Sequence, residues 1–289
     1  MSLDVIMDAI MLGMIFAIMS FGVFISFRIL NIPDLTIDGS FTTGCAASVI
    51  CCVAGHPYLG ILMAFIVGGV AGIVTGLLQT KGKIQPLLAG ILTMTALYSV
   101  NLKIMAGQPN ISTFGLTTIF TAFEGLGRYH KAVLIGLILV LLAVVLYAFL
   151  KTQLGMSLRA TGDNEAMVRA SSINSDMMKI MGLSLANAIV ALGGGIFAQY
   201  QNFADVSGGI GMMVVGLASI IVGEAFLRKK TLVYHFMAVI VGAIAYRFIL
   251  TIALQIGIAS TDLKLVSAIL VALAISLPQL VGKRGKKHA

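Results

Sequence analysis

The sequence predicts an all-α polytopic membrane protein, because of its composition, its long apolar runs and the uneven placement of its basic residues. Of 289 residues, 59% are hydrophobic and only 10% are charged, and the mean hydropathy is +1.04. A helix needs about 20 apolar residues to cross a bilayer. The apolar runs are continuous, whereas the strands of a membrane barrel alternate and span about 9–11 residues. We therefore expect residues 1–289 to form a single transmembrane domain.

The apolar runs predict about nine transmembrane helices, within a range of eight to ten. In chain order they cover residues 5–27, 36–54, 58–78, 84–105, 132–150, 180–200, 210–227, 232–256 and 263–281. The polar residues around 31–40 leave the second crossing short.

Basic residues gather on one side of these crossings. The segments 28–36, 81–83, 151–179 and 228–230 and the carboxyl tail together hold fourteen Lys and Arg, and the opposite side holds four. Cytoplasmic loops of membrane proteins carry such an excess. We therefore expect the carboxyl terminus and residues 151–179 to be cytoplasmic and the amino terminus to be outside. This topology explains the net charge of +8 without a nucleic-acid partner.

A shift of 148 residues places two parts of the chain in correspondence, residues 34–133 and 182–281. Lys81 then falls on Lys229 and Tyr98 on Tyr246. Each stretch contains an outward-to-inward helix, a basic turn and a returning helix. Transporters commonly consist of such repeats, with the pathway between them.

Residues 151–179 form a polar island between apolar runs and carry seven of the chain's thirty Lys, Arg, Asp and Glu residues. Thr161 or Asp163 could cap the start of a short helix there. Ala166, Met167 and Ala170 would then form a small apolar face. Two interpretations are open: an amphipathic helix on the membrane surface, or a helix that fits a groove in a soluble motor subunit.

Residues 31–40 (NIPDLTIDGS) are unusually polar for a membrane border. Non-helical backbone at membrane depth occurs only where protein or water covers it. The segment could therefore be an unwound element that lines a pathway, with Asp34, Thr36, Asp38 and Ser40 as polar contacts. It could instead be a cytoplasmic turn in which Asp38 starts the next helix.

Glu224 and Arg247 are the charges predicted to lie deep in the membrane. Glu224 precedes Arg228 by four residues, so the two could pair near the cytoplasmic interface. Arg247 lies fifteen residues into its crossing, and ionisable groups at such depth usually face a cavity or a partner. Either a carboxylate such as Asp205 or Asp262 neutralises Arg247, or Arg247 meets an anionic substrate group.

The sequence contains no catalytic or metal-binding motif. The four histidines are scattered and form no metal-ligand pair. There is also no G-x-x-x-x-G-K-[ST] phosphate loop, so any ATP chemistry belongs to a partner. We expect neither an enzyme nor a resident cofactor.

Several motifs together resemble the permeases of ABC importers, in the group that serves branched-chain amino acids and simple sugars. The run 158–165 (LRATGDNE), followed by Ala170 and Ile173-Asn174, resembles the coupling loop of this group. Further motifs are similar to permeases of tryptophan/tyrosine-type import systems: residues 31–41 (NIPDLTIDGSF), 198–207 (AQYQNFADVS), 216–225 (GLASIIVGEA), 246–247 (YR) and 260–264 (STDLK).

This resemblance implies a type II ABC importer fold in a bacterial inner membrane. It implies a complex of two copies of the permease, two ATP-hydrolysing subunits that bind ATP and Mg²⁺, and an extracytoplasmic substrate-binding protein. The coupling helix would comprise Thr161, Gly162, Asp163, Asn164, Glu165, Met167, Arg169 and Ala170. Replacing Gly162 or Asp163 is expected to abolish transport without loss of folding. The alternatives are an ATP-independent secondary transporter or channel, with Asp38 or Glu224 as the ion-coupling residue, and a membrane-embedded enzyme.

Overall fold

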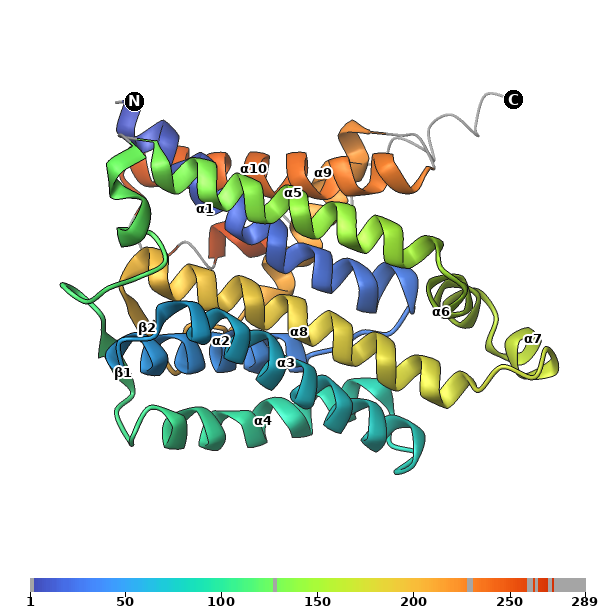
Figure 1. Ribbon diagram of the computed structural model, residues 1–289. Helices are drawn as coiled ribbons and strands as arrows, with labels where there is room; N and C mark the ends of the chain where they lie inside the picture. Colours follow the sequence, from blue (N-terminus) through green and yellow to red (C-terminus); the bar gives the residue numbers. More distant parts are fainter. Residues whose placement is uncertain are drawn as a thin grey trace, which may run out of the picture.

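A computed structural model describes residues 3–126, 129–227, 231–258, 262, 265–269 and 272, and these residues form a bundle of long helices (Figure 1). The first half contains α1 (Leu3–Val23), its π-helical continuation η1 (Phe24–Ile29), α2 (Thr36–Val53), α3 (Pro57–Thr80), α4 (Pro86–Ile104) and the short helix η2 (Thr121–Leu126). The second half contains α5 (His130–Lys151), α6 (Gln153–Asp163), α7 (Glu165–Ala170), α8 (Ser175–Gln201), α9 (Met212–Phe226) and α10 (Leu232–Gln255).

The all-α polytopic class is confirmed. Among the described residues, seven helices are long and apolar enough to cross a membrane. They correspond to seven of the nine predicted crossings. Residues 210–227, predicted as the seventh crossing, form the shorter helix α9 of 15 residues. Most of the ninth predicted crossing, residues 263–281, lies outside the described residues.

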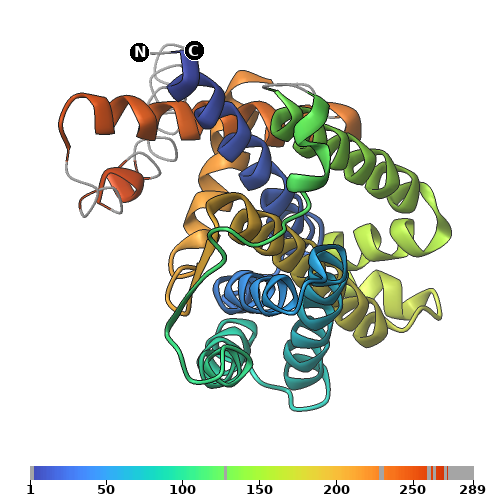
Figure 2. The same cartoon turned by 60° about the vertical axis from the view of Figure 1, so that its left-hand side comes forward.

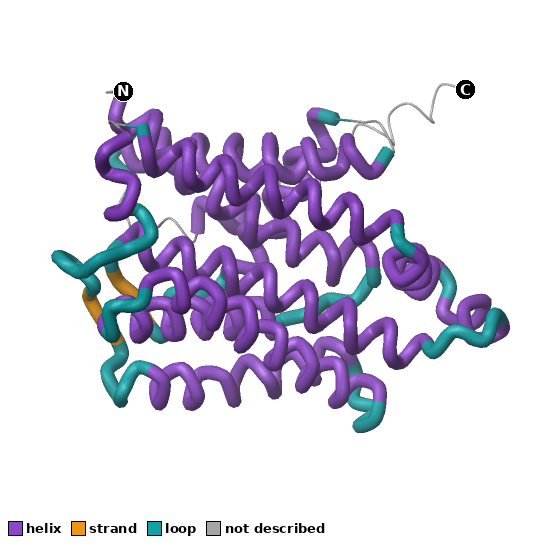
Figure 3. The backbone as a smooth tube through the Cα atoms, viewed as in Figure 1, coloured by secondary structure: helices purple, strands orange, loops and turns teal. Residues whose placement is uncertain are grey.

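The two ends of the bundle differ in structure. At one end, strand β1 (Asn110–Ser112) pairs antiparallel with β2 (Phe203–Asp205). At the other end, α6 and α7 project from the bundle, and Figure 3 shows the loops that flank them. The predicted cytoplasmic island therefore lies at the opposite end from the small sheet.

Helix α8 lies at the centre of the bundle, in contact with α1, α2 and α3 (Figure 2). Small residues allow this close packing. A Cβ added at Gly72 of α3 would overlap the backbone carbonyl of Leu183, and one at Gly44 of α2 would overlap that of Ala191. The side chains of Cys45 and Ser48 donate across the α2–α8 contact to the carbonyls of Gly194 and Gly195, each at 3.1 Å.

The helices follow the predicted repeat in chain order. Adding 148 to the bounds of α2, α3 and α4 gives residues 184–201, 205–228 and 234–252. These ranges overlap α8, α9 and α10 respectively. The α2–α8 hydrogen bonds join residues 147 to 151 positions apart and advance in the same direction along both helices. The two helices are therefore parallel, and the repeat itself stays a prediction.

Helices α2 and α9 both begin inside the bundle. Ser40 in the second turn of α2 contacts Asn187, which lies twelve residues into α8 and thus about 18 Å along it. The turn before α9 reaches the same region, because Gly209 N donates to Thr42 Oγ1 of α2 at 3.1 Å. Two helix starts and their irregular backbone therefore meet at mid-depth.

Candidate coupling segment and solute pathway

Two short helices, separated by a single capping residue, form the segment that the sequence predicts to be cytoplasmic. Thr152 accepts a hydrogen bond from Gly155 N at 3.3 Å and starts α6. Asn164 has extended backbone angles, and its Oδ1 accepts from Met167 N at 3.1 Å, which starts α7. The predicted helix start at Thr161 or Asp163 is wrong, because both residues lie in the last turn of α6. Asn164 is the cap.

Helix α6 packs directly on the end of α1. A Cβ at Gly162 would overlap the carbonyl oxygen of Ile29, the last residue of η1. Thr161 is buried beside it and donates to the Ser157 carbonyl at 2.7 Å. A side chain at position 162 would therefore push α6 away from η1, so we expect replacement of Gly162 to lower stability, and the expected loss of transport with retained folding stays a prediction.

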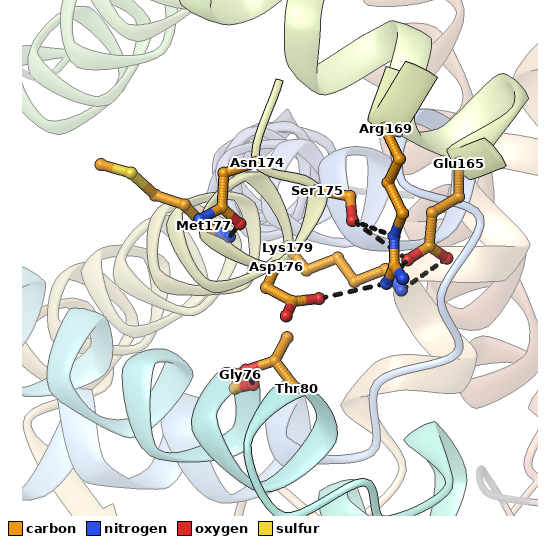
Figure 4. A network of polar contacts seen from close by, with 9 residues as sticks. All are labelled: Gly76, Thr80, Glu165, Arg169, Asn174, Ser175, Asp176, Met177 and Lys179. Carbon is orange, nitrogen blue, oxygen red and sulfur yellow. Dashed lines mark hydrogen bonds and ion pairs between the residues drawn. The ribbon is translucent and has the colours of Figure 1, made fainter. Parts of the chain in front are cut away.

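A charged network ties α7 to the start of α8 (Figure 4). Glu165 accepts from Arg169 Nη2 and from Lys179 Nζ, each at 2.7 Å, and from Ser175 Oγ at 3.2 Å. Arg169 Nε also donates to Ser175 at 2.8 Å. The hydrogen bond from Lys179, supported by its positive charge and by Arg169, holds the pKa of Glu165 below its ordinary value of 4.5.

The opposite side of α7 is available to a partner. Val168 is buried, whereas Met167 is 55% exposed. Glu165 and Arg169 face α8 in the network, so α7 presents Met167 outward while its charged residues hold it in place. This arrangement gives a short, rigidly held projection with an apolar tip.

Three of the predicted pathway residues form a buried polar network. Asp34 accepts from Thr36 N at 2.9 Å and from Asn187 Nδ2 at 2.7 Å. Ser40 donates to Asn187 Oδ1 at 2.7 Å, and Thr36 shares a hydrogen bond with Thr75 of α3 at 2.7 Å. Asp34, Thr36 and Ser40 are fully buried. Their observed contacts join α2 to α3 and α8, and their role in a pathway stays a prediction.

Asp38 does not start α2, as one interpretation expected, but caps α9. Its Oδ2 accepts from Gly211 N at 2.8 Å and its Oδ1 from Met213 N at 2.7 Å. A carboxylate is stabilised at a helix amino terminus by the free N–H groups and the positive end of the dipole. Gly211 has a φ of +93°, a conformation that glycine adopts without strain.

A cavity of about 270 Å³ adjoins this cap. Its walls come from the first two turns of α2, the middle and outer part of α4, and the turn before α9. The lining residues are Asp38, Gly39, Thr42, Met94, Thr95, Tyr98, Asn101, Val206 and Ile210. Asp38 is the only predicted pathway residue that lines it.

Glu224 and Arg247 lie near opposite ends of the bundle. Glu224 pairs with Arg28 Nε at 3.0 Å and with His235 Nδ1 at 3.3 Å; Arg228 lies outside the described residues. The guanidinium of Arg247 lies 5.7 Å from the ring centre of Phe16. Its electrostatic neighbours include Tyr200 and Asp8, rather than the predicted Asp205.

Sequence reasoning missed Asn187, Asn101 and Arg28. A signal existed for Asn187, since it is an uncharged polar residue in the middle of an apolar crossing and must find a hydrogen-bond partner there. For Arg28, the sequence was used only to assign a side of the membrane, and its ion pair with Glu224 was not predicted. Asn101, near the end of a crossing, gave no signal.

A bundle of long apolar helices with two short helices projecting from one end is the architecture of a membrane permease. The chain matches, over residues 5–276, the family model described as the permease component of branched-chain amino acid transport systems. The chain therefore belongs to this permease family.

Relatives and one solved structure agree with this assignment. The chain is 41% identical to the tyrosine transport system permease protein of Clostridioides difficile over 260 residues, covering 90% of this chain and 86% of the relative. It is 25% identical to the ribose import permease protein RbsC of Escherichia coli K12 over 244 residues, covering 84% and 75%. An inward-facing ABC transporter of the metal-chelate type matches in fold, with a TM-score of 0.52 and 15% identity, over 96% of this chain and 85% of the other.

Proposed function

We propose that this chain is the translocating subunit of an ATP-driven importer for a small solute, an amino acid of the tryptophan or tyrosine type. The 41% identity to a tyrosine transport permease supports the substrate class. The importer would contain two copies of the permease, two ATPase subunits and an extracytoplasmic binding protein, in a bacterial plasma membrane.

The observation that carries the proposal is the projection formed by α6 and α7. Motor closure must reach the membrane helices through a stiff contact, because a loose loop would absorb the motion. Here α7 is held to α8 by Glu165, Arg169 and Lys179, and α6 packs on η1 through Gly162. A push on Met167 would thus be transmitted to two of the long helices. ATP binding and hydrolysis would shift the populations of the access states.

Purification of the complex tests the proposal. We expect an ATPase subunit to co-purify with the full-length permease in mild detergent and to dissociate in Met167→Asp. The matched control is Phe114→Asp, which puts the same charge on an 85% exposed apolar residue at the other end of the molecule. Equal retention of the ATPase in both variants would contradict docking at α7. ATP-independent solute movement by the lone permease in liposomes would favour a secondary transporter.

A further inference from the structure

The cavity between α2, α4 and the turn before α9 has the composition of a binding site for an amine with an apolar body. Its lining combines Met94, Tyr98, Val206 and Ile210 with a small number of polar groups. The polar groups include the Asp38 carboxylate, and none of the described lining residues is Lys, Arg or His. The described part of the lining therefore contains a carboxylate, which already accepts from two α9 amides, and no positively charged side chain, a composition that suits a cation.

Asn101 adds a second acceptor. The side chain is 1% exposed, and its Nδ2 donates to the Gly39 carbonyl at 3.4 Å. Its Oδ1 is buried and has no hydrogen-bond partner among the described residues. The amide orientation follows from the Gly39 contact, because the flipped amide would place two acceptor oxygens together. A buried carbonyl oxygen without a donor is rare in folded proteins. A small shift of the cavity wall would let a bound N–H group reach and satisfy it.

The backbone around the cavity gives an independent argument. Val206 and Ile210 belong to the irregular stretch between β2 and α9, which meets α2 at mid-depth. Non-helical backbone at membrane depth is tolerated where it is covered by protein or lines a cavity. In transporters, interrupted helices commonly form the substrate site near the midplane. Tyr98, which is 51% exposed, offers its ring to an aromatic ligand.

We infer that this cavity, here named the α2–α4 site, binds an aromatic amine or amino acid through its ammonium group, with Asn101 Oδ1 and Asp38 as acceptors and Tyr98 against the ring. The inference rests on the proposed function, since a tyrosine-type solute is the one expected to pass. It adds that the α2–α4 site selects for the ammonium group and does not recognise the carboxylate.

Three probes separate these groups: tyrosine, tyramine, which lacks the carboxylate, and 3-(4-hydroxyphenyl)propionate, which lacks the ammonium. We would measure saturation-transfer NMR of each with the full-length permease in nanodiscs, because this method detects weak binding. Tyrosine and tyramine are expected to give saturable ring signals and to displace each other. The propionate is expected to give no saturable signal. Saturable propionate binding as strong as that of tyramine, or no saturable tyramine binding, would overturn the inference.

Variants locate the binding. Tyr98→Ala and Asn101→Leu are each expected to weaken tyramine binding about tenfold or more. Leu92→Ala is the control, since Leu92 is an exposed α4 residue outside the lining and its replacement should change nothing. Tyr98 is half-exposed, so its truncation leaves the core intact even if Asn101→Leu folds poorly. Unchanged binding in Tyr98→Ala would overturn the site. ATPase co-purification is independent of these measurements, so the proposed function can stand if the site fails.

Discussion

Single polar side chains determine where the helices of this permease meet. Asn187 shows this most clearly, because it donates to Asp34 at 2.7 Å and accepts from Ser40 at 2.7 Å. The carboxylate of Asp34 is fully buried and depends on such donors. Asn187 therefore fixes the start of α2 against the middle of α8.

Replacing Asn187 by Leu is expected to destabilise the permease by about 3 kcal/mol, because it leaves both a buried carboxylate and a buried hydroxyl short of a partner. Thermal unfolding in detergent would measure the loss. Gln108→Leu, which removes an exposed amide, is the control and should leave the melting temperature unchanged. A melting temperature as high in Asn187→Leu as in Gln108→Leu would show that the buried network contributes nothing.

The pKa of Glu165 makes the α7–α8 contact sensitive to acid. Because the folded-state pKa is below 4.5, the stabilisation is complete above pH 4.5 and is lost as the pH falls through the lowered pKa. The side chain is 36% exposed, so solvent screening limits the contribution to about 1 kcal/mol or less. A spin label at position 167 should become mobile below pH 4.5. In Glu165→Gln the label should be mobile at every pH; an unchanged acid transition in that variant would assign the effect to another group.

For single residues, the sequence showed which side chains were unusual. It did not show which partners those side chains contact. Asp38 was recognised as a residue for a cap or a pathway, yet its partners are the amides of Gly211 and Met213, more than 170 positions away. Nothing local in the sequence encodes that distance. The Asn164 cap was missed because Thr161 and Asp163 are equally suitable capping residues by type.

Among the elements, α6 links the segment predicted to be cytoplasmic to the end of α1. Its last turn packs on η1, a π-helical end to α1, and π-helical turns are frequent at functional sites. Arg28 of η1 in turn pairs with Glu224 of α9 at 3.0 Å. A displacement of α6 would therefore move the end of α1 and, through the Arg28–Glu224 pair, α9 as well.

Gly162→Ala is expected to destabilise the permease by about 1–3 kcal/mol, since the added methyl group overlaps the Ile29 backbone. Gly136→Ala in α5 is the matched control: a Cβ there meets only Met14 Sδ, at 3.8 Å. That change should be neutral or stabilising by about 0.5–1 kcal/mol, because alanine favours the helix. Unfolding curves of the two variants compare them directly, and equal stability would show that α6 can move away from η1 at no cost.

The length of an apolar run predicted the long helices correctly. It did not predict that α9 is too short to cross a membrane. Residues 210–227 are as apolar as a full crossing. The helix begins only at Met212 because the Asp38 carboxylate binds its first amides and Gly209 donates to Thr42. Its starting depth therefore depends on tertiary contacts with α2, which composition does not reveal.

For the whole molecule, the distribution of basic residues between the two ends of the bundle predicts its orientation in the membrane. Arg28, Lys81 and Lys151 lie at helix ends on the same side as α6 and α7, while the β1–β2 sheet lies at the other end (Figure 1). Because positive residues are retained in the cytoplasm, the α7 end should be inside and the sheet outside. The same orientation is needed for α7 to meet a cytoplasmic ATPase and for the sheet end to meet a binding protein.

Labelling of single cysteines would test this orientation in intact cells. Cys45, Cys51 and Cys52 are first replaced by Ala or Ser, and one cysteine is then introduced at position 114 or at position 167. Both positions are more than half exposed, so access to the side chain does not limit either reaction. A membrane-impermeant maleimide should label position 114 in intact cells and position 167 only after permeabilisation. The opposite pattern would place α7 outside, where no ATP-hydrolysing subunit could reach it, and would remove the coupling role while leaving the fold untouched.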